Sequence, residues 1–133
     1  MATINLTVDN FEETLDKNEI VLIDFWAEWC GPCRMFGPIF EKTSEKHEDI
    51  AFAKCNTEEA PEIAGSFGVR SIPTLAIFRE KVLLFIQPGM VPEEALEDLI
   101  KQVKDVDMDE VRAEIEKEKQ KEESEESEQA AQA

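Results

Sequence analysis

Two cysteines directly follow an apolar run, and this arrangement limits what the chain can fold into. Residues 20–27 are rich in β-branched and aromatic side chains without clean alternation of polarity, as expected of a strand that is covered on both faces. Cys30-Gly31-Pro32-Cys33 comes next, and a proline favours the first turn of a helix. Because positions i and i+3 of a helix are neighbours, the two sulfurs can form a disulfide without moving the rest of the fold. The spacing predicts reversible thiol–disulfide chemistry.

The two thiols are expected to play different roles. A cysteine at the start of a helix lies near unpaired backbone N–H groups and the positive end of the helix dipole, and both lower the pKa of its thiol. We therefore expect an exposed Cys30 to be the nucleophile and Cys33 to be the resolving thiol.

Two other interpretations of the cysteine pair have to be weighed. A structural zinc site needs four ligands, but His47 is expected near the end of the helix and Cys55 on the next strand, so we expect no metal. A permanent disulfide suits small secreted domains. Residues 1–11 show no basic start, apolar core or small-residue cleavage site, so we expect the thiols to lie in the reducing cytoplasm.

Two longer stretches carry a resemblance to a known family. Residues 21–34 read VLIDFWAEWCGPCR and residues 67–74 read FGVRSIPT. Both resemble the signature stretches of the thioredoxin family, at the separation found there, and the resemblance covers about residues 4–104. It implies the thioredoxin fold, an α/β fold whose central mixed β-sheet is flanked by helices on both faces. It also implies that the chain is a protein disulfide reductase without a bound cofactor. NADPH would be used only indirectly, through a thioredoxin reductase that reduces this protein.

Hydrophobic periodicity and turn signals predict alternating elements. Strands are expected at residues 4–6, 20–27, 50–56, 74–79 and 82–87. A helix is expected to about residue 16 with Asp9 as N-cap, and another at 32–48, where Pro38 predicts a kink near Gly37. Further helices are expected at 58–64, ended by Gly65, and around the apolar face formed by Leu96, Leu99, Ile100 and Val103. The turn at residues 79–82 lacks the Asn-Gly of a tight hairpin, so its register or length is expected to differ from that of the family.

Asp24 interrupts the apolar strand six positions before Cys30. From its position alone, its carboxyl is either buried, with a raised pKa, or reaches solvent at the strand end. The resemblance implies burial, because the matching Asp of the family serves as general base for the resolving cysteine. A nearby Lys accompanies it there, which Lys54 matches. The expected catalytic set is Cys30, Cys33, Asp24 and Lys54.

The resemblance also implies a client-binding surface beside Cys30. Pro73 matches a proline that the family holds in the cis form facing the cysteines, whereas the sequence alone leaves the isomer open. The expected apolar patch, suited to an extended client segment, consists of Trp29, Gly31, Pro32, Ile72, Pro73 and Gly89. Pro88 departs from the family pattern, so client specificity is expected to differ. Cys55 is either inert core packing or a regulatory thiol.

The net charge of −17 bears on partners and on domain organisation. It disfavours binding to nucleic acid and to anionic membranes, and no apolar run approaches the roughly 18 residues that span a bilayer. We expect a monomer that acts on client proteins. Residues 1–104 are expected to form one domain, and residues 105–133 an acidic, low-complexity tail that is partly helical or disordered. The alternative function is a thioredoxin-like adaptor or co-chaperone that holds clients on the patch and a basic partner on the tail.

Overall fold

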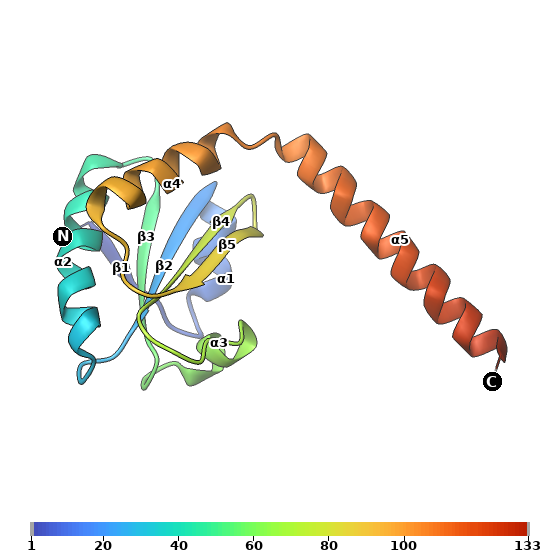
Figure 1. Cartoon of the computed structure of the whole chain (residues 1–133), viewed down its shortest axis with the longest axis horizontal. Helices are drawn as coiled ribbons and strands as arrows, with labels where there is room; N and C mark the ends of the chain where they lie inside the picture. Colours follow the sequence, from blue (N-terminus) through green and yellow to red (C-terminus); the bar gives the residue numbers. More distant parts are fainter. Residues whose placement is uncertain (1, 133) are drawn as a thin grey trace. The chain divides into compact units, whose positions relative to one another are not determined.

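The computed structural model describes residues 2–132, whose helices and strands alternate along the chain (Figure 1). The elements are β1 (Thr3–Asn5), α1 (Phe11–Lys17), β2 (Ile20–Trp26), α2 (Gly31–Lys46), β3 (Ala51–Asn56), α3 (Pro61–Ser66), β4 (Thr74–Arg79), β5 (Val82–Pro88), α4 (Glu93–Asp105) and α5 (Met108–Gln132).

The five strands form one mixed sheet in the order β1-β3-β2-β4-β5. β1 and β2 both pair in parallel with β3, whereas β4 is antiparallel to β2 and β5 is antiparallel to β4. β2 is therefore the central strand. The expected mixed sheet is confirmed.

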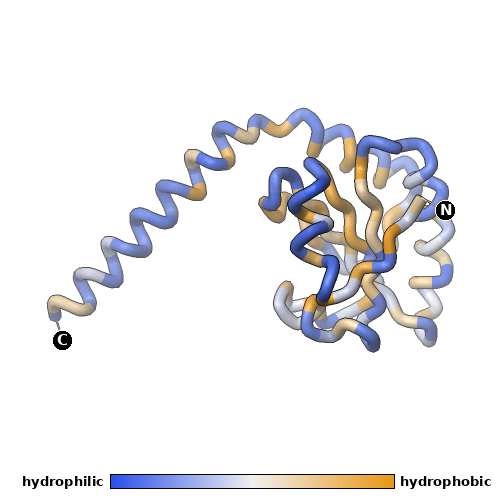
Figure 2. The backbone as a smooth tube through the Cα atoms, turned by 180° about the vertical axis from the view of Figure 1, so that it is seen from behind, coloured by the Kyte–Doolittle hydropathy of each residue, from blue (hydrophilic) through white to orange (hydrophobic). Residues whose placement is uncertain are grey.

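The core consists of two hydrophobic clusters, one on each face of the sheet. On β2, Ile23 and Phe25 belong to the cluster that includes side chains of α1 and α3. Leu22 belongs to the cluster that includes side chains of α2 and α4. Because both faces of β2 are covered, its sequence shows no polar alternation. Figure 2 shows hydrophobic residues concentrated on the strands and few of them on α5.

Several expected helix boundaries are wrong. α3 begins at Pro61 and not at residue 58. The N-cap position of α1 is Asn10 and not Asp9, and it makes no side-chain cap, because its amide oxygen accepts the backbone N–H of Thr7 instead (2.8 Å). Gly65 lies inside α3. Gly68 has a left-handed backbone, with φ at +66°. The glycine that follows the end of the helix in this conformation is therefore three residues after the expected Gly65.

The β4–β5 hairpin closes through Glu80 and Lys81, which have φ values of +51° and +68°. Two successive positive φ angles are the requirement of a tight type I′ turn, which usually recruits Asn and Gly. This chain makes a two-residue turn without them. The pairing shifts register between Ile77 and Phe78.

The chain divides into two compact units, residues 1–103 and 104–133. Within the second unit, α5 is a continuous helix of 25 residues. Ion pairs one turn apart join Arg112 to Asp109 (2.6 Å) and Lys117 to Glu114 (3.8 Å). Among the described residues, none of the helices combines the length and the apolar character needed to cross a membrane.

Candidate active site

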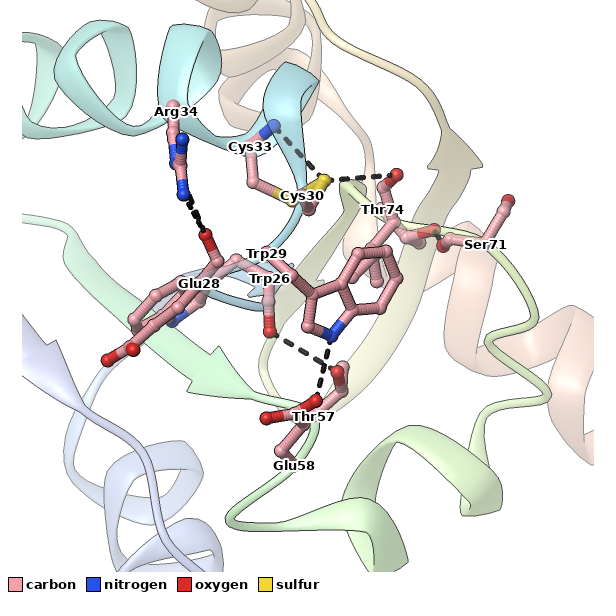
Figure 3. Close-up of a disulfide and its surroundings, with 11 residues drawn as sticks. Trp26, Glu28, Trp29, Cys30, Cys33, Arg34, Thr57, Glu58, Ser71 and Thr74 are labelled. Carbon is pink, nitrogen blue, oxygen red and sulfur yellow. Dashed lines mark hydrogen bonds between the residues drawn. A yellow bond between two sulfur atoms is a disulfide. The ribbon is translucent and has the colours of Figure 1, made fainter.

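The cysteine pair lies where the chain leaves the central strand and starts α2. Cys30 is the N-cap residue of α2, and Pro32 lies in the first helical turn, the position that suits its fixed φ and missing N–H. The sulfurs of Cys30 and Cys33 are joined in a disulfide, with the Cα atoms 5.2 Å apart (Figure 3). The predicted pairing across one helical turn is therefore present.

Among the described residues, the first turn of the helix supplies a backbone hydrogen bond to the sulfur of Cys30 and none to that of Cys33. The backbone N–H of Cys33 donates to Sγ of Cys30 (3.2 Å), and this sulfur lies 3.6 Å from the carbonyl oxygen of Ile72. A donor aimed at Sγ favours its thiolate. The expectation that exposure distinguishes Cys30 is wrong, because both cysteines are 4% exposed. The difference lies in the N–H donor at the N-cap position.

Hydrogen bonds hold the loop before the cysteines. The Arg34 guanidinium donates twice to the carbonyl oxygen of Glu28 (2.9 and 3.2 Å). The indole N–H of Trp29 donates to the carboxylate of Glu58 (2.7 Å). Trp29 is 67% exposed. Figure 3 shows both contacts beside the disulfide. Trp29 is thus an anchored apolar surface next to Cys30.

The loop that faces the cysteines is built around Pro73. The Ile72–Pro73 bond is cis, as the family resemblance implied. The backbone N–H of Gly89 donates to the carbonyl oxygen of Pro73 (2.8 Å), so the segment after β5 is joined to this loop. Gly31, Pro32 and Gly89 are exposed and Ile72 is half-buried, but Pro73 is buried and so lies beneath the surface.

Asp24 is fully buried, and neither carboxylate oxygen has a hydrogen-bond partner among the described residues. This burial raises the pKa of the carboxyl to about 7, while the positive charge of Lys54 acts in the opposite direction. Lys54 is the register partner of Asp24 across β2 and β3. Its Nζ lies 4.8 Å from the centre of the Trp26 ring. A carboxyl with this pKa can hold or release a proton near neutral pH.

The residues considered for zinc are separated. Cys55 is fully buried, and burial, together with the charge of Asp24, raises the pKa of its thiol to about 11. The His47 ring is within 2.7 Å of the Glu97 carboxylate and stacks on Phe52. In residues 2–132, no group of three or more His, Cys, Asp or Glu side chains is placed to hold a metal ion. The high pKa and burial favour the inert interpretation of Cys55.

A groove of about 530 Å³ opens beside Trp29. Of its lining, the sequence analysis identified only Trp29 and Ile72. The residues that it missed are Thr57, Pro61, Ala64, Gly65, Val69, Arg70 and Ser71. They come from α3 and its flanking loops. Residues 69–71 lie in the stretch 67–74 that carries the family resemblance, but only the folded chain brings the whole set beside Trp29.

Comparisons with known proteins agree with this geometry. The thioredoxin family model matches residues 2–105. A Streptomyces coelicolor protein named "Putative thioredoxin 2" is 57% identical over 111 residues, 84% of this chain and 83% of that one. The thioredoxin of Alicyclobacillus acidocaldarius is 43% identical over 105 residues, 75% of this chain and all of that one. A solved mutant thioredoxin from Halobacterium salinarum has a TM-score of 0.73 at 33% identity, covering 79% of this chain and 93% of that one.

These relatives and the paired cysteines do not favour the adaptor or co-chaperone alternative, because a binding module needs no redox pair at this spacing. The disulfide between Cys30 and Cys33 is itself the redox group. The chain belongs to the thioredoxin family and is a thiol–disulfide oxidoreductase, a protein disulfide reductase that works through a redox-active cysteine pair.

Proposed function

We propose that Cys30 attacks the client and that Cys33 releases it. In the reduced protein, the Cys30 thiolate attacks one sulfur of a client disulfide, and the other client sulfur leaves as a thiolate that takes up a proton. The Cys33 thiolate then attacks Sγ of Cys30, which breaks the mixed disulfide and frees the reduced client. Two electrons pass to the client, and the Cys30–Cys33 disulfide forms. The single observation that carries this assignment is the N–H of Cys33 aimed at Sγ of Cys30.

Asp24 is the base that we propose for the second step. The Cys33 thiol must lose its proton before it can attack, and a carboxylate with a pKa of about 7 accepts a proton near neutral pH. Lys54 has the supporting role, because its charge keeps a fraction of the buried Asp24 ionised. The family resemblance, together with the burial of Asp24 and its register with Lys54, supports both roles.

The client-binding surface that we propose surrounds the disulfide. Trp29, Gly31, Pro32, Ile72 and Gly89 form its surface, and Pro73 supports it from below. The groove beside Trp29 extends this surface toward α3. An extended client segment fits it better than a folded surface does, because backbone groups of the Pro73 loop lie beside the attacking sulfur.

The remaining assignments concern partners and organisation. A thioredoxin reductase that uses NADPH would reduce the Cys30–Cys33 disulfide after each turnover. The location that we propose is the reducing cytoplasm, where such a cycle can run. Residues 1–104 would be the catalytic domain of a monomer, and residues 105–133 an acidic appendage. The negative charge supports protein clients over nucleic acid or anionic membranes as partners.

A trapping experiment tests the order of attack. The Cys33→Ser variant lacks the resolving thiol, so it should remain covalently joined to insulin chains or to lysate clients through Cys30. Dithiothreitol should release them. The Cys30→Ser variant and the double variant should hold none, and the unmodified protein should reduce insulin with dithiothreitol as electron donor.

Each other outcome has a definite meaning. Clients held by Cys30→Ser but lost from Cys33→Ser would reverse the two roles. Clients held through Cys55 would show that this thiol is accessible. Clients retained after removal of both Cys30 and Cys33, without insulin reduction by the unmodified protein, would restore the adaptor hypothesis.

A further inference from the structure

Gly37 lies inside α2, where a glycine is less favourable for the helix than an alanine. Among the described glycines, only Gly68 and Gly89 have positive φ angles, so the backbone at position 37 does not require a glycine. The ring of the following Pro38 disfavours a side chain on the residue before it. Either Pro38 or the surroundings of Gly37 can therefore account for a glycine here.

A side chain at position 37 would meet the ammonium group of Lys54. A Cβ atom built on Gly37 would lie 3.6 Å from Nζ of Lys54, and it would meet no other atom outside the neighbouring backbone of α2 within 4 Å. The methyl group of an alanine would therefore touch the ammonium, and a larger side chain would occupy its place. Position 37 is one helical turn after Cys33, so the ammonium lies beside the face of α2 that carries this cysteine.

The Lys54 ammonium has an aromatic ring as neighbour but no hydrogen-bond acceptor. Its Nζ lies 4.8 Å from the centre of the Trp26 ring, and it donates no hydrogen bond to any of residues 2–132. An ammonium group has N–H donors only, and a charge without partners is costly. Because Lys54 is half-buried, solvent can supply the acceptors where space is left around Nζ. The bare backbone of Gly37 leaves that space.

The charge of Asp24 depends on the position of this ammonium. Asp24 and Lys54 are register partners on β2 and β3. Their side chains lie on the α2 side of the sheet, because Leu22 and Phe52, two positions before them, pack in the cluster of that face. The buried carboxylate has no hydrogen-bond partner among the described residues, and the positive charge of Lys54 favours its ionised form. A displaced ammonium would therefore favour the protonated carboxyl.

We propose that Gly37 is a positioning residue, whose missing side chain keeps the Lys54 ammonium hydrated and in place beside Asp24. A leucine at position 37 would displace the ammonium, and Asp24 would then stay protonated over a wider pH range. Less carboxylate would be present near neutral pH to accept the proton of Cys33. Only this kinetic consequence rests on the function proposed above, because the placement of Lys54 does not depend on the role of Asp24 as base.

The test follows the titration of Asp24 by NMR of its carboxyl carbon in the full-length, oxidised protein. Cys30 and Cys33 cannot titrate there, because they form the disulfide. Cys55 is the other titratable group that interacts with Asp24, and with a pKa of about 11 it stays neutral throughout the titration. The Gly37→Leu variant should show a higher pKa of Asp24, and Gly37→Ala a smaller rise.

Two comparisons separate an effect through Lys54 from an effect on the helix. In a Lys54→Met background, Gly37→Leu should not change the titration of Asp24 further, because the ammonium is already absent. Gly65→Ala is the matched control for the titration, since this glycine also lies inside a helix and its Cβ would meet no atom within 4 Å. It should leave the titration of Asp24 unchanged.

The kinetic consequence is measured by stopped flow with the reduced protein and dithiobis(nitrobenzoate). Attack by Cys30 releases one thionitrobenzoate, and attack by Cys33 on the mixed disulfide releases the second. At neutral pH the second release should be at least about two-fold slower in Gly37→Leu, and the difference should vanish at high pH, where Asp24 is ionised in both proteins. The rate of the first release should not change.

An unchanged titration of Asp24 in a folded Gly37→Leu variant would overturn the proposal. If that variant does not fold, as shown by circular dichroism, Gly37→Ala provides the same test, because its methyl group alone reaches Nζ. A shift that persists in the Lys54→Met background would also overturn the proposal, since the effect would then pass through Pro38 and the backbone of α2. A shifted titration with an unchanged second release would support the placement of Lys54 and contradict the role of Asp24 as base.

Discussion

The backbone N–H of Cys33 lies 3.2 Å from the sulfur of Cys30 and donates to it. The residue proposed to resolve the mixed disulfide therefore also supplies, through its main chain, the donor that favours the thiolate of the proposed attacking residue. This relationship distinguishes the two sulfurs although their exposure is equal.

The first prediction concerns thiol reactivity. In the reduced protein, Cys30 should be alkylated by iodoacetamide at lower pH than Cys33, and Cys55 should react only after unfolding, because burial and Asp24 raise its pKa to about 11. Mass spectrometry of peptides labelled between pH 5 and 10 gives the three profiles. Equal profiles for Cys30 and Cys33 would contradict the role assigned to the N-cap hydrogen bond.

The second prediction concerns Asp24 and stability. Its folded pKa is about 7 against an ordinary value of 3.8, so between these values the folded state binds more protons than the unfolded state. Stability therefore falls as the pH rises through this interval, and the full cost above pH 7 is about 4 kcal/mol. Asp24→Asn should stabilise the oxidised protein by up to that amount at pH 8 and by little at pH 3.5, as measured by urea unfolding. The same variant should reduce insulin more slowly. A constant difference at both pH values would show that ionisation of Asp24 is not the cause.

The third prediction concerns Lys54. Its positive charge lowers the pKa of Asp24, so Lys54→Met should raise that pKa further. Lys54→Arg keeps the charge and should change it less. Titration of the Asp24 carboxyl carbon by NMR measures the pKa directly. If the Met variant titrates as the unmodified protein does, the two groups are not coupled and Lys54 has no part in the proton step.

The fourth prediction concerns the β4–β5 turn. Glu80 and Lys81 hold positive φ angles, which cost L-residues about 1 kcal/mol or more each. Glu80→Asn/Lys81→Gly should raise the free energy of unfolding by about 1 kcal/mol. The loss of the exposed Lys81–Asp16 ion pair (2.7 Å) offsets little of this gain. Chemical denaturation measures the change, and the Asp16→Asn variant isolates the ion-pair contribution. A destabilised double variant would contradict the type I′ interpretation.

The fifth prediction concerns the acidic tail. Deletion of residues 105–133 should leave kcat/KM for insulin within about two-fold, because no residue of the proposed site lies there. The matched control replaces the tail by an uncharged linker of the same length. If both the deletion variant and the linker variant lose kcat/KM several-fold relative to the full-length protein, the charge of the tail takes part in catalysis or docking.

The sequence predicts much of the fold because its strongest signals are local. Three elements each follow from one local signal. β2 follows from the apolar run 20–26, the start of α2 from Pro32, and α4 from its apolar face. Helix ends were harder, since Gly65 and Gly68 are both plausible terminators and only the backbone shows which one has a positive φ.

The sequence predicted the candidate site only where one short motif contains its residues. The two cysteines lie three positions apart in the sequence, so their pairing could be predicted. The burial of Asp24 depends on α2 and β3 packing around it. The position of Asp24 in the sequence therefore left open whether its carboxyl is buried or reaches solvent. The equal exposure of the two cysteines and the groove beside Trp29 arise from contacts between distant segments, such as Cys30 and Ile72, which are 42 residues apart. No spacing rule reports such contacts.

The place of β2 in the sheet has a consequence for the durability of the redox centre. Proteins open locally first at frayed ends and edges, and here the edges are β1 and β5. β2 is hydrogen-bonded on both sides, to β3 and to β4, so either edge strand can detach briefly while the strand that carries the chain into Cys30 keeps both neighbours. Transient opening of the outer strands therefore leaves the hydrogen bonds of β2, the strand that leads into Cys30, intact.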